Sequence, residues 1–248
     1  MFSLEIDCDP DDRDMLIAEL WEQGSAGIVE LNPLTVRAFF EAGTPRAALL
    51  NLFPGARQRE EEQRDWVQAA RDLLQPMEVG RRFFLVPEWR DDPAPENRFR
   101  IVVNPGMAFG TGVHETTRLC IEALEDFVKP GMTVLDVGTG SGILARAATL
   151  LGAGRVLACD IDPIAVEIAG FGFVGSADAV ATKVADIVLA NISPEAIAHL
   201  GADLLRVRKP GGVLLASGFE GHEVDQVRTA LPAVREVRHK GNWALLVV

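Results

Sequence analysis

Short apolar strand patterns alternate with helical patterns along the second half of the chain. The strand patterns are MTVLDVG, RVLACDID, GFVGSADAV, ADIVLANI and GGVLLASG, and helical segments such as GILARAATLLG and PEAIAHLGADLLRV separate them. Strands connected in this way form right-handed crossovers, which give a parallel sheet covered by helices on both faces. The pattern therefore predicts an α/β fold for this region. The ending VREVRHKGNWALLVV predicts an antiparallel hairpin around Gly241-Asn242 at the sheet edge.

The first 56 residues follow a different order. FSLEID, GIVEL and TVRAFF alternate like strands, whereas MLIAELWEQ and TPRAALLNLF have helical spacing. This β-α-β-β-α order predicts a small α+β domain of ferredoxin-like type over residues 1–56. The following charged stretch, RQREEEQRDWVQAARDLLQ, has one apolar helical face, so we expect a linker helix over residues 57–76 and a second domain over residues 77–248.

The charge balance argues against a protein that binds nucleic acid. The 248 residues carry a net charge of -12, whereas a protein that holds RNA or DNA by its phosphates needs a basic face. Between Met1 and Glu22 the only basic residue is Arg13. This acidic region is either a solvated face or a docking surface for a cationic protein.

The sequence shows neither a secretory signal nor a membrane-spanning segment. Its first residues carry acids where a secretory signal carries bases, and no apolar run approaches the roughly 18 residues of a membrane span. We therefore expect a cytoplasmic protein with no membrane partner and no direct binding to nucleic acid.

The run DVGTGSG, Asp136 to Gly142, follows a strand and opens a helix. In an α/β fold, backbone amides and a helix N-terminus face a ligand at this place. Its G-x-G-x-G spacing differs from the G-x-G-x-x-G of dinucleotide-binding proteins. Asp160 lies about 20 residues further on, at the end of the next strand, where a carboxylate can reach a ribose hydroxyl. A nucleoside ligand is therefore predicted, with a glycine turn used only for packing as the alternative.

Two residues are candidates for catalysis. Asn191 ends the strand ADIVLANI, where its amide oxygen could accept a hydrogen bond from a substrate amine; a buried or turn-capping asparagine is the alternative. His114 is the candidate general base because histidine titrates near neutral pH. We favour a structural role for it, in which it ties a loop across the active site. The four histidines are too dispersed for a metal site.

The stretch NPGMAFGTGVHETT, Asn104 to Thr117, is the most specific marker in the chain. Together with LDVGTGSGILARAA, DIDP, ADIVLANI and KPGG in this order, it closely resembles the PrmA family, the methyltransferases of ribosomal protein L11. The resemblance runs from about Trp66 to the C-terminus. It implies a Rossmann-like, seven-stranded methyltransferase core and an N-terminal domain that binds the basic ribosomal protein. It also implies methylation of lysine side chains and of the N-terminal amine, and we expect a monomer.

The resemblance to S-adenosylmethionine-dependent methyltransferases assigns a cofactor and the residues that hold it. The assigned contacts are Thr117, Gly138, Gly140, Asp160 and Asn191, with Phe109 and Gly110 in the AFGTG stretch. Asp136 is expected near the methionine ammonium group. The segment after Asp162 is shorter than in the family, and Asp178 is our candidate for the adenine amino group, with a solvent-facing turn acid as the alternative.

Two other functions agree with the same motifs. A related methyltransferase that modifies another protein lysine or a small amine would share them, since the motifs concern the cofactor and say little about the acceptor. A non-catalytic cofactor-binding protein is compatible with the shortened segment. The glycine spacing disfavours a dehydrogenase.

Overall fold

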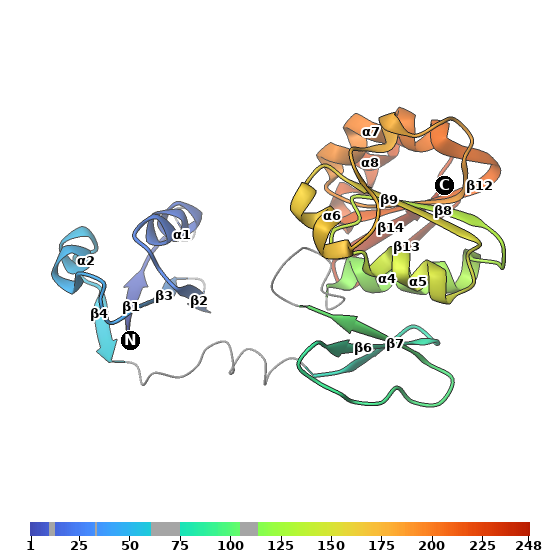
Figure 1. Cartoon of the computed structure of the whole chain (residues 1–248). Coiled ribbons are helices and arrows are strands. Elements are labelled where there is room, and N and C mark those ends of the chain that lie inside the picture. The colour runs from blue at the N-terminus through green and yellow to red at the C-terminus, as the bar shows by residue number, and fades with distance from the viewer. Residues whose placement is uncertain (10–12, 33, 61–74, 105–113) are drawn as a thin grey trace. The chain divides into compact units, whose positions relative to one another are not determined.

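The chain forms two compact units in the computed structural model, Met1–Leu73 and Leu74–Val248 (Figure 1). The described residues are 1–9, 13–32, 34–60, 75–104 and 114–248. Within these ranges no helix combines the length and the apolar character needed to cross a membrane.

The N-terminal unit is a four-stranded antiparallel sheet with two helices. Its elements are β1 (Phe2–Asp7), α1 (Arg13–Glu22), β2 (Gly27–Asn32), β3 (Thr35–Phe40), α2 (Arg46–Leu52) and β4 (Arg57–Glu60). The strand order is β2-β3-β1-β4. Alternate residues of β1, such as Phe2 and Leu4, pack with Leu20 of α1 and Leu49 of α2, so both helices cover one face. The ferredoxin-like prediction is confirmed, and β4 supplies its last strand.

The linker helix predicted over residues 57–76 is wrong for its first four residues. Arg57–Glu60 form β4, which pairs antiparallel with β1 at the sheet edge. All four side chains are exposed. The strand therefore lacks the apolar alternation by which a sequence pattern is recognised. Residues 61–74 lie outside the described residues.

Acidic side chains of β1 pair with arginines on the sheet face opposite the helices. The largely buried Glu5 contacts Arg37 of β3 and lies 3.1 Å from Arg59 of β4. Arg57 pairs with Asp7 at 2.6 Å, and its hydrogen bond lowers the pKa of Asp7 to about 2. Both carboxylates are thus neutralised by neighbouring strands, so the acidic sequence of this segment does not make this face acidic.

The second unit begins with a small sheet. Strand β5 (Met77–Val79) pairs antiparallel with β6 (Phe83–Pro87), and β6 pairs parallel with β7 (Phe99–Val103). Residues of all three strands share one apolar core with the helices α4 (Glu115–Phe127) and α5 (Ile143–Leu150). The small sheet therefore belongs to the second unit.

A seven-stranded sheet forms the centre of this unit, in the order β10-β9-β8-β11-β12-β14-β13. The strands are β8 (Thr133–Val137), β9 (Arg155–Asp160), β10 (Phe173–Val174), β11 (Ala185–Asn191), β12 (Arg208–Glu220), β13 (Glu236–Lys240) and β14 (Trp243–Val247). Strands β8 to β12 are parallel, and β14 runs antiparallel to both of its neighbours. Helices α4 and α5 cover one face, and α7 (Pro194–Val207) and α8 (Val224–Ala230) cover the other (Figure 1). This confirms the predicted three-layer fold and its terminal hairpin.

The third strand of the predicted alternation is much shorter than GFVGSADAV suggests. Only Phe173–Val174 pair with β9, and Ala177–Ala179 form the 3-10 turn η1. The preceding helix α6 is also short, Pro163–Ala169, and ends at Gly170 with φ 76°. Beyond Val174, this side of the sheet is therefore continued by a turn instead of a strand.

Candidate functional site

A cavity of about 480 Å³ lies at the carboxyl ends of the parallel strands, which is where open α/β sheets bind ligands. Its wall contains residues of β8, β9, β11 and β12, with additions from α4 and β14. Six residues predicted from the sequence line it: His114, Thr117, Gly138, Gly140, Asp160 and Asn191. The fold thus brings together side chains that lie up to 77 positions apart, from His114 to Asn191.

The glycine turn after β8 requires glycine at its first position. Gly138 has φ +72°, and a Cβ built there would lie 2.4 Å from Cγ2 of Ile192. Both the backbone conformation and the space exclude a larger residue. The turn leads to Gly142, which is the N-cap of α5, so a ligand in the cavity faces backbone amides at the start of a helix.

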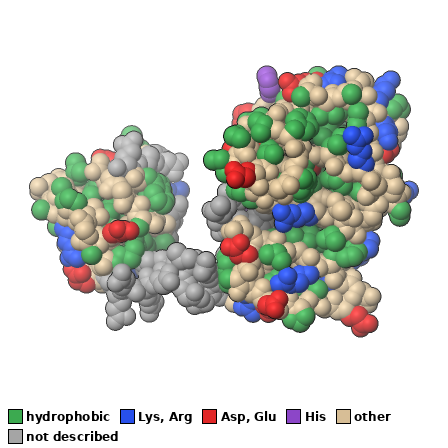
Figure 2. Space-filling view, viewed as in Figure 1, with side chains coloured by type: hydrophobic (Ala, Val, Ile, Leu, Met, Phe, Trp, Pro, Cys, Tyr) green, Lys and Arg blue, Asp and Glu red, His purple; other side chains and the backbone are tan. Residues whose placement is uncertain are grey.

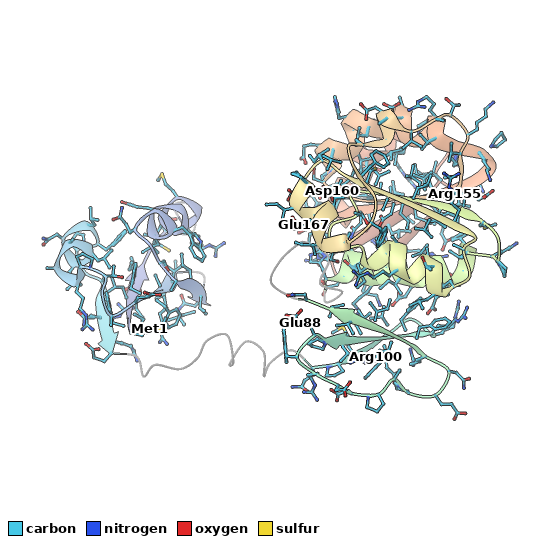
Figure 3. The ribbon with its side chains drawn as sticks, in the orientation of Figure 1. Met1, Glu88, Arg100, Arg155, Asp160 and Glu167 are labelled. Carbon is cyan, nitrogen blue, oxygen red and sulfur yellow. The ribbon has the colours of Figure 1, made fainter. Side chains whose placement is uncertain are left out.

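Asp160 connects the glycine turn to the end of β9. Its Oδ2 accepts a hydrogen bond from the backbone N–H of Gly140 at 2.9 Å, and its Oδ1 accepts one from Asp162 at 3.0 Å. A carboxylate has about four acceptor positions, which leaves capacity for the hydroxyls of a ribose. Figure 3 labels Asp160 between the sheet and the start of α6.

Asn191 and Thr117 lie beside each other at another part of the wall. Nδ2 of Asn191 donates to Oγ1 of Thr117 at 3.5 Å, and both residues are buried. This contact orients the side-chain amide of Asn191, because its nitrogen is hydrogen-bonded to a residue of α4. Oδ1 of Asn191 has no hydrogen-bond partner among the described residues. A buried acceptor without a partner costs stability, so it marks a position where a ligand N–H would bind favourably.

His114 is the N-cap of α4 and also lines the cavity. Its ring accepts a hydrogen bond from the backbone N–H of Thr116, and its Nδ1 lies 2.8 Å from Oγ1 of the same residue. The ring packs edge-on against Trp243 of β14, with 4.4 Å between centroids. These contacts fix the orientation of the imidazole between two elements of the wall.

Asp136 does not line the cavity but lies beneath the glycine turn, fully buried. Its Oδ2 accepts a hydrogen bond from Oγ1 of Thr139 at 2.8 Å, and its Oδ1 has no partner within the described part of the chain. Burial raises the pKa of Asp136 from its ordinary value of 3.8 to about 6, and the hydrogen bond from Thr139 opposes that shift. A cation near this carboxylate would stabilise its charged form.

The Asp136→Asn variant should change how stability depends on pH. Because the pKa is raised on folding, Asp136 stabilises the folded protein most at low pH, and this contribution is lost as the pH rises through about 6. A pKa difference of about two corresponds to about 3 kcal/mol. We expect the free energy of unfolding of the variant, relative to the unsubstituted protein, to rise by up to that amount between pH 4 and pH 8.

Urea denaturation of both proteins without cofactor, at both pH values, measures this difference. Titrating groups that do not interact with Asp136 are shared by the two proteins, so they cancel in the comparison. An equal difference at pH 4 and pH 8 would contradict the raised pKa.

The residue predicted to contact the adenine amino group does not line the cavity. Asp178 is exposed, its Oδ1 accepts the backbone N–H of Ala179, and it is not part of the wall. Gly175 and Ser176 line the cavity in its place. The adenine role of Asp178 remains a prediction for which these contacts give no support. Phe109 and Gly110 lie outside the described residues.

Sequence reasoning did not identify several residues of the wall. Ile161, Ser176, Ile192 and Trp243 all line the cavity. Ile161 is 78% exposed, an unusual state for a large apolar side chain next to a strand end. Its position directly after Asp160 was the available signal, because an apolar residue beside a ribose-binding acid can pack against a nucleobase.

Comparison with known proteins gives one consistent family. The family profile described as "Ribosomal protein L11 methyltransferase (PrmA)" matches residues 49–248. The ribosomal protein L11 methyltransferase of Pelotomaculum thermopropionicum is 41% identical over 220 residues, which cover 81% of this chain and 71% of that protein. That of Burkholderia pseudomallei is 41% identical over 225 residues, which cover 86% of this chain and 72% of the relative. Other relatives are matched over less of their length, such as 61% of the Symbiobacterium thermophilum protein.

A solved structure agrees with this result. The crystal structure of the ribosomal protein L11 methylase from Lactobacillus delbrueckii subsp. bulgaricus is 30% identical, with a TM-score of 0.63. The match covers 70% of this chain and 96% of that chain.

Proposed function

This chain belongs to the ribosomal protein L11 methyltransferase (PrmA) family, and we propose that it transfers methyl groups from S-adenosylmethionine to amines of ribosomal protein L11. The acceptors in this proposal are lysine side chains and the N-terminal amine. The observation that carries it is the buried Oδ1 of Asn191, an acceptor in the cavity wall without a partner among the described residues.

The residues of the cavity fit the cofactor. Gly138 and Gly140 allow its methionine end to approach the backbone, and the carboxylate of Asp160 suits the ribose hydroxyls. The exposed side chain of Ile161 would be covered by the adenine ring, and Ser176 offers a hydroxyl at the same end. Burial raises the pKa of Asp136, and a cationic group bound nearby would favour its charged form.

The reaction is a direct displacement for which the cofactor supplies an electrophilic methyl group. The acceptor nitrogen must be neutral and aligned with the sulfur–methyl bond. Because an ordinary lysine has a pKa of about 10.4, favouring its neutral form at pH 7 requires about 4 kcal/mol. Well-aligned reactants can gain roughly 7 to 11 kcal/mol from positioning. No covalent nucleophile is needed.

The chain's own residues can supply this positioning. Oδ1 of Asn191 would accept an N–H of the acceptor amine and so direct its lone pair, while Thr117 holds the amide by its nitrogen. The rings of His114 and Trp243 and the side chain of Ile192 form a largely apolar wall around that place. Such a wall disfavours the ammonium form of the acceptor and excludes water.

His114 should act by holding the wall and not as a general base. The His114→Asn variant keeps a good helix N-cap and removes the titratable ring. We expect kcat to fall by less than about tenfold, whereas loss of a general base typically costs 10² to 10⁴. Steady-state kinetics from pH 6 to 9 test this, with His199→Asn, an exposed position on α7, as the matched control. A loss above a hundredfold together with a flattened pH profile would identify His114 as the base.

The N-terminal unit is our candidate for recognition of the ribosomal protein. Glu5 and Asp7 are paired with arginines, but the unit holds further exposed acids such as Glu19 and Glu41. Long-range attraction between such acids and a basic protein would raise the rate of association. On the visible face of the second unit, basic side chains are interspersed with acidic ones instead of forming one patch (Figure 2). Together with the net charge of -12, this favours a protein partner over nucleic acid. We propose that the chain acts as a monomer in the cytoplasm.

The decisive experiment combines the purified chain, purified ribosomal protein L11 and S-adenosylmethionine with a labelled methyl group. Mass mapping of peptides should locate the label on amines of L11. L11 whose amines have been acetylated beforehand is the control and should take up no label. Cofactor binding without transfer to L11 would refute the proposed acceptor, and absence of cofactor binding would refute the proposed reaction.

A further inference from the structure

The nucleobase end of the cavity is not held by the sheet. Strand β10 contributes only two pairs, Phe173 with Cys159 and Val174 with Asp160. The last backbone bond on this side runs from the N–H of Gly175 to the carbonyl of Asp160 at 2.8 Å. Ser176 and the η1 turn that follows it therefore need another support.

The Arg206 side chain, near the end of α7, provides hydrogen bonds to this turn. Its guanidinium donates to the carbonyls of Val180 at 2.8 Å, Ala177 at 3.0 Å and Asp178 at 3.3 Å. Its Nε donates to Oδ1 of Asp203, one helical turn earlier, at 2.8 Å. One side chain thus binds three carbonyls of a four-residue segment.

Two other features tie the η1 turn, or the chain that follows it, to α7. The backbone N–H groups of Lys183 and Val184 donate to the carbonyls of Arg206 and Val207 at 3.0 and 2.8 Å. Ala177 is buried in the core that α7 shares with the sheet. Ser176 lies directly before Ala177, so its position depends on α7. This helix follows η1 in the sequence only after the whole of β11.

We propose that Arg206 is a positioning residue for the nucleobase of the cofactor. It acts through the η1 turn, which it holds so that Gly175 and Ser176 form the wall at the adenine end. With the ribose at Asp160 and the methionine end at the glycine turn, the base would extend toward Ile161 and Ser176. The inference rests on the proposed function, since it concerns the same cavity.

Arginine is suited to this role and lysine is not. The guanidinium presents five donors in a rigid fork, so it can bind several carbonyls and a carboxylate at once, whereas an ammonium is a point charge with three donors on one atom. Arg206→Lys should keep the ion pair with Asp203 but lose most of the carbonyl contacts. Arg206→Gln removes the charge as well.

The test uses calorimetry with S-adenosylhomocysteine and with S-inosylhomocysteine, which lacks the adenine amino group. For Arg206→Gln we expect the Kd of S-adenosylhomocysteine to rise about tenfold and the preference over the inosine compound to fall toward one. Arg206→Lys should be intermediate. With L11 as acceptor, the KM for S-adenosylmethionine should rise by a similar factor, while kcat stays within about twofold because the acceptor end is unchanged.

Two control variants separate positioning from general effects. Asp203→Asn removes the ion pair but leaves the carbonyl contacts of Arg206, and Arg228→Gln removes an exposed arginine of α8 that pairs with Asp225 at 4.0 Å. Both should retain the adenine preference. If both Arg206 variants keep the Kd and the preference of the unsubstituted protein, the role of Arg206 is refuted while the proposed function stands. If the unsubstituted protein binds neither ligand, the proposed function fails and the inference fails with it. Should Arg206→Gln not fold, the preference of Arg206→Lys decides.

Discussion

Replacing Asn191 with alanine should lower kcat by a factor of about 10² to 10³, the usual loss when one preorganised polar group of an active site is removed. The reason is the lost acceptor: among the described residues of the wall, Oδ1 of Asn191 is the buried side-chain acceptor that lacks a partner. The Kd of the cofactor should change much less, by under about tenfold, since the glycine turn and Asp160 remain.

Single-turnover kinetics with L11 and calorimetry with S-adenosylmethionine separate the two effects. Asn242→Ala is the matched control, because Asn242 is an exposed asparagine on the turn between β13 and β14. It should leave both quantities unchanged. A Kd that rises as much as kcat falls would show that Asn191 serves the cofactor and not the acceptor.

The second large effect is expected at Asp160. Asp160→Asn keeps an oxygen for the N–H of Gly140 but removes the charge. Hydrogen bonds to charged groups contribute about 1.5 to 3 kcal/mol each, and two ribose hydroxyls are within the capacity of this carboxylate. We expect the Kd of S-adenosylmethionine to rise by about 10² to 10³. Calorimetry measures it directly.

The matched control for this variant is Asp225→Asn, on the surface of α8. Its Kd should equal that of the unsubstituted protein. Asp178→Asn should be measured as well. Weaker binding of S-adenosylmethionine by that variant would support the predicted adenine contact of Asp178, although its side chain is exposed. A Kd within threefold for Asp160→Asn would contradict the ribose assignment.

The strands and the glycine turn could be predicted because their causes are local. Buried parallel strands are continuous apolar runs, and Gly138 needs both a positive φ and space beside Ile192. Two predictions failed for the opposite reason. Arg57–Glu60 form a strand only because β1 offers an edge to pair with. The run GFVGSADAV reads as a strand, yet after two residues its carbonyls bond to a side chain of α7 instead of to a neighbouring strand.

The charge of the protein surface could not be predicted from local sequence either. The acids near the N-terminus suggested an acidic surface, but Glu5 and Asp7 are paired with arginines that follow 32 to 54 positions later. Which charges remain available to a partner depends on strand pairing. Local composition does not contain that information.

The layers of the fold, the terminal hairpin, the family and six residues of the cavity wall could be derived from the sequence, since hydrophobic periodicity, glycine conformation and short motifs extend over a few residues. Only the assembled fold shows that Asp136 lies buried beneath the turn, that Ser176 lines the cavity whereas Asp178 does not, and that Trp243 packs against His114. These facts depend on contacts between distant segments. Such contacts form only when the whole sheet and its helices are assembled.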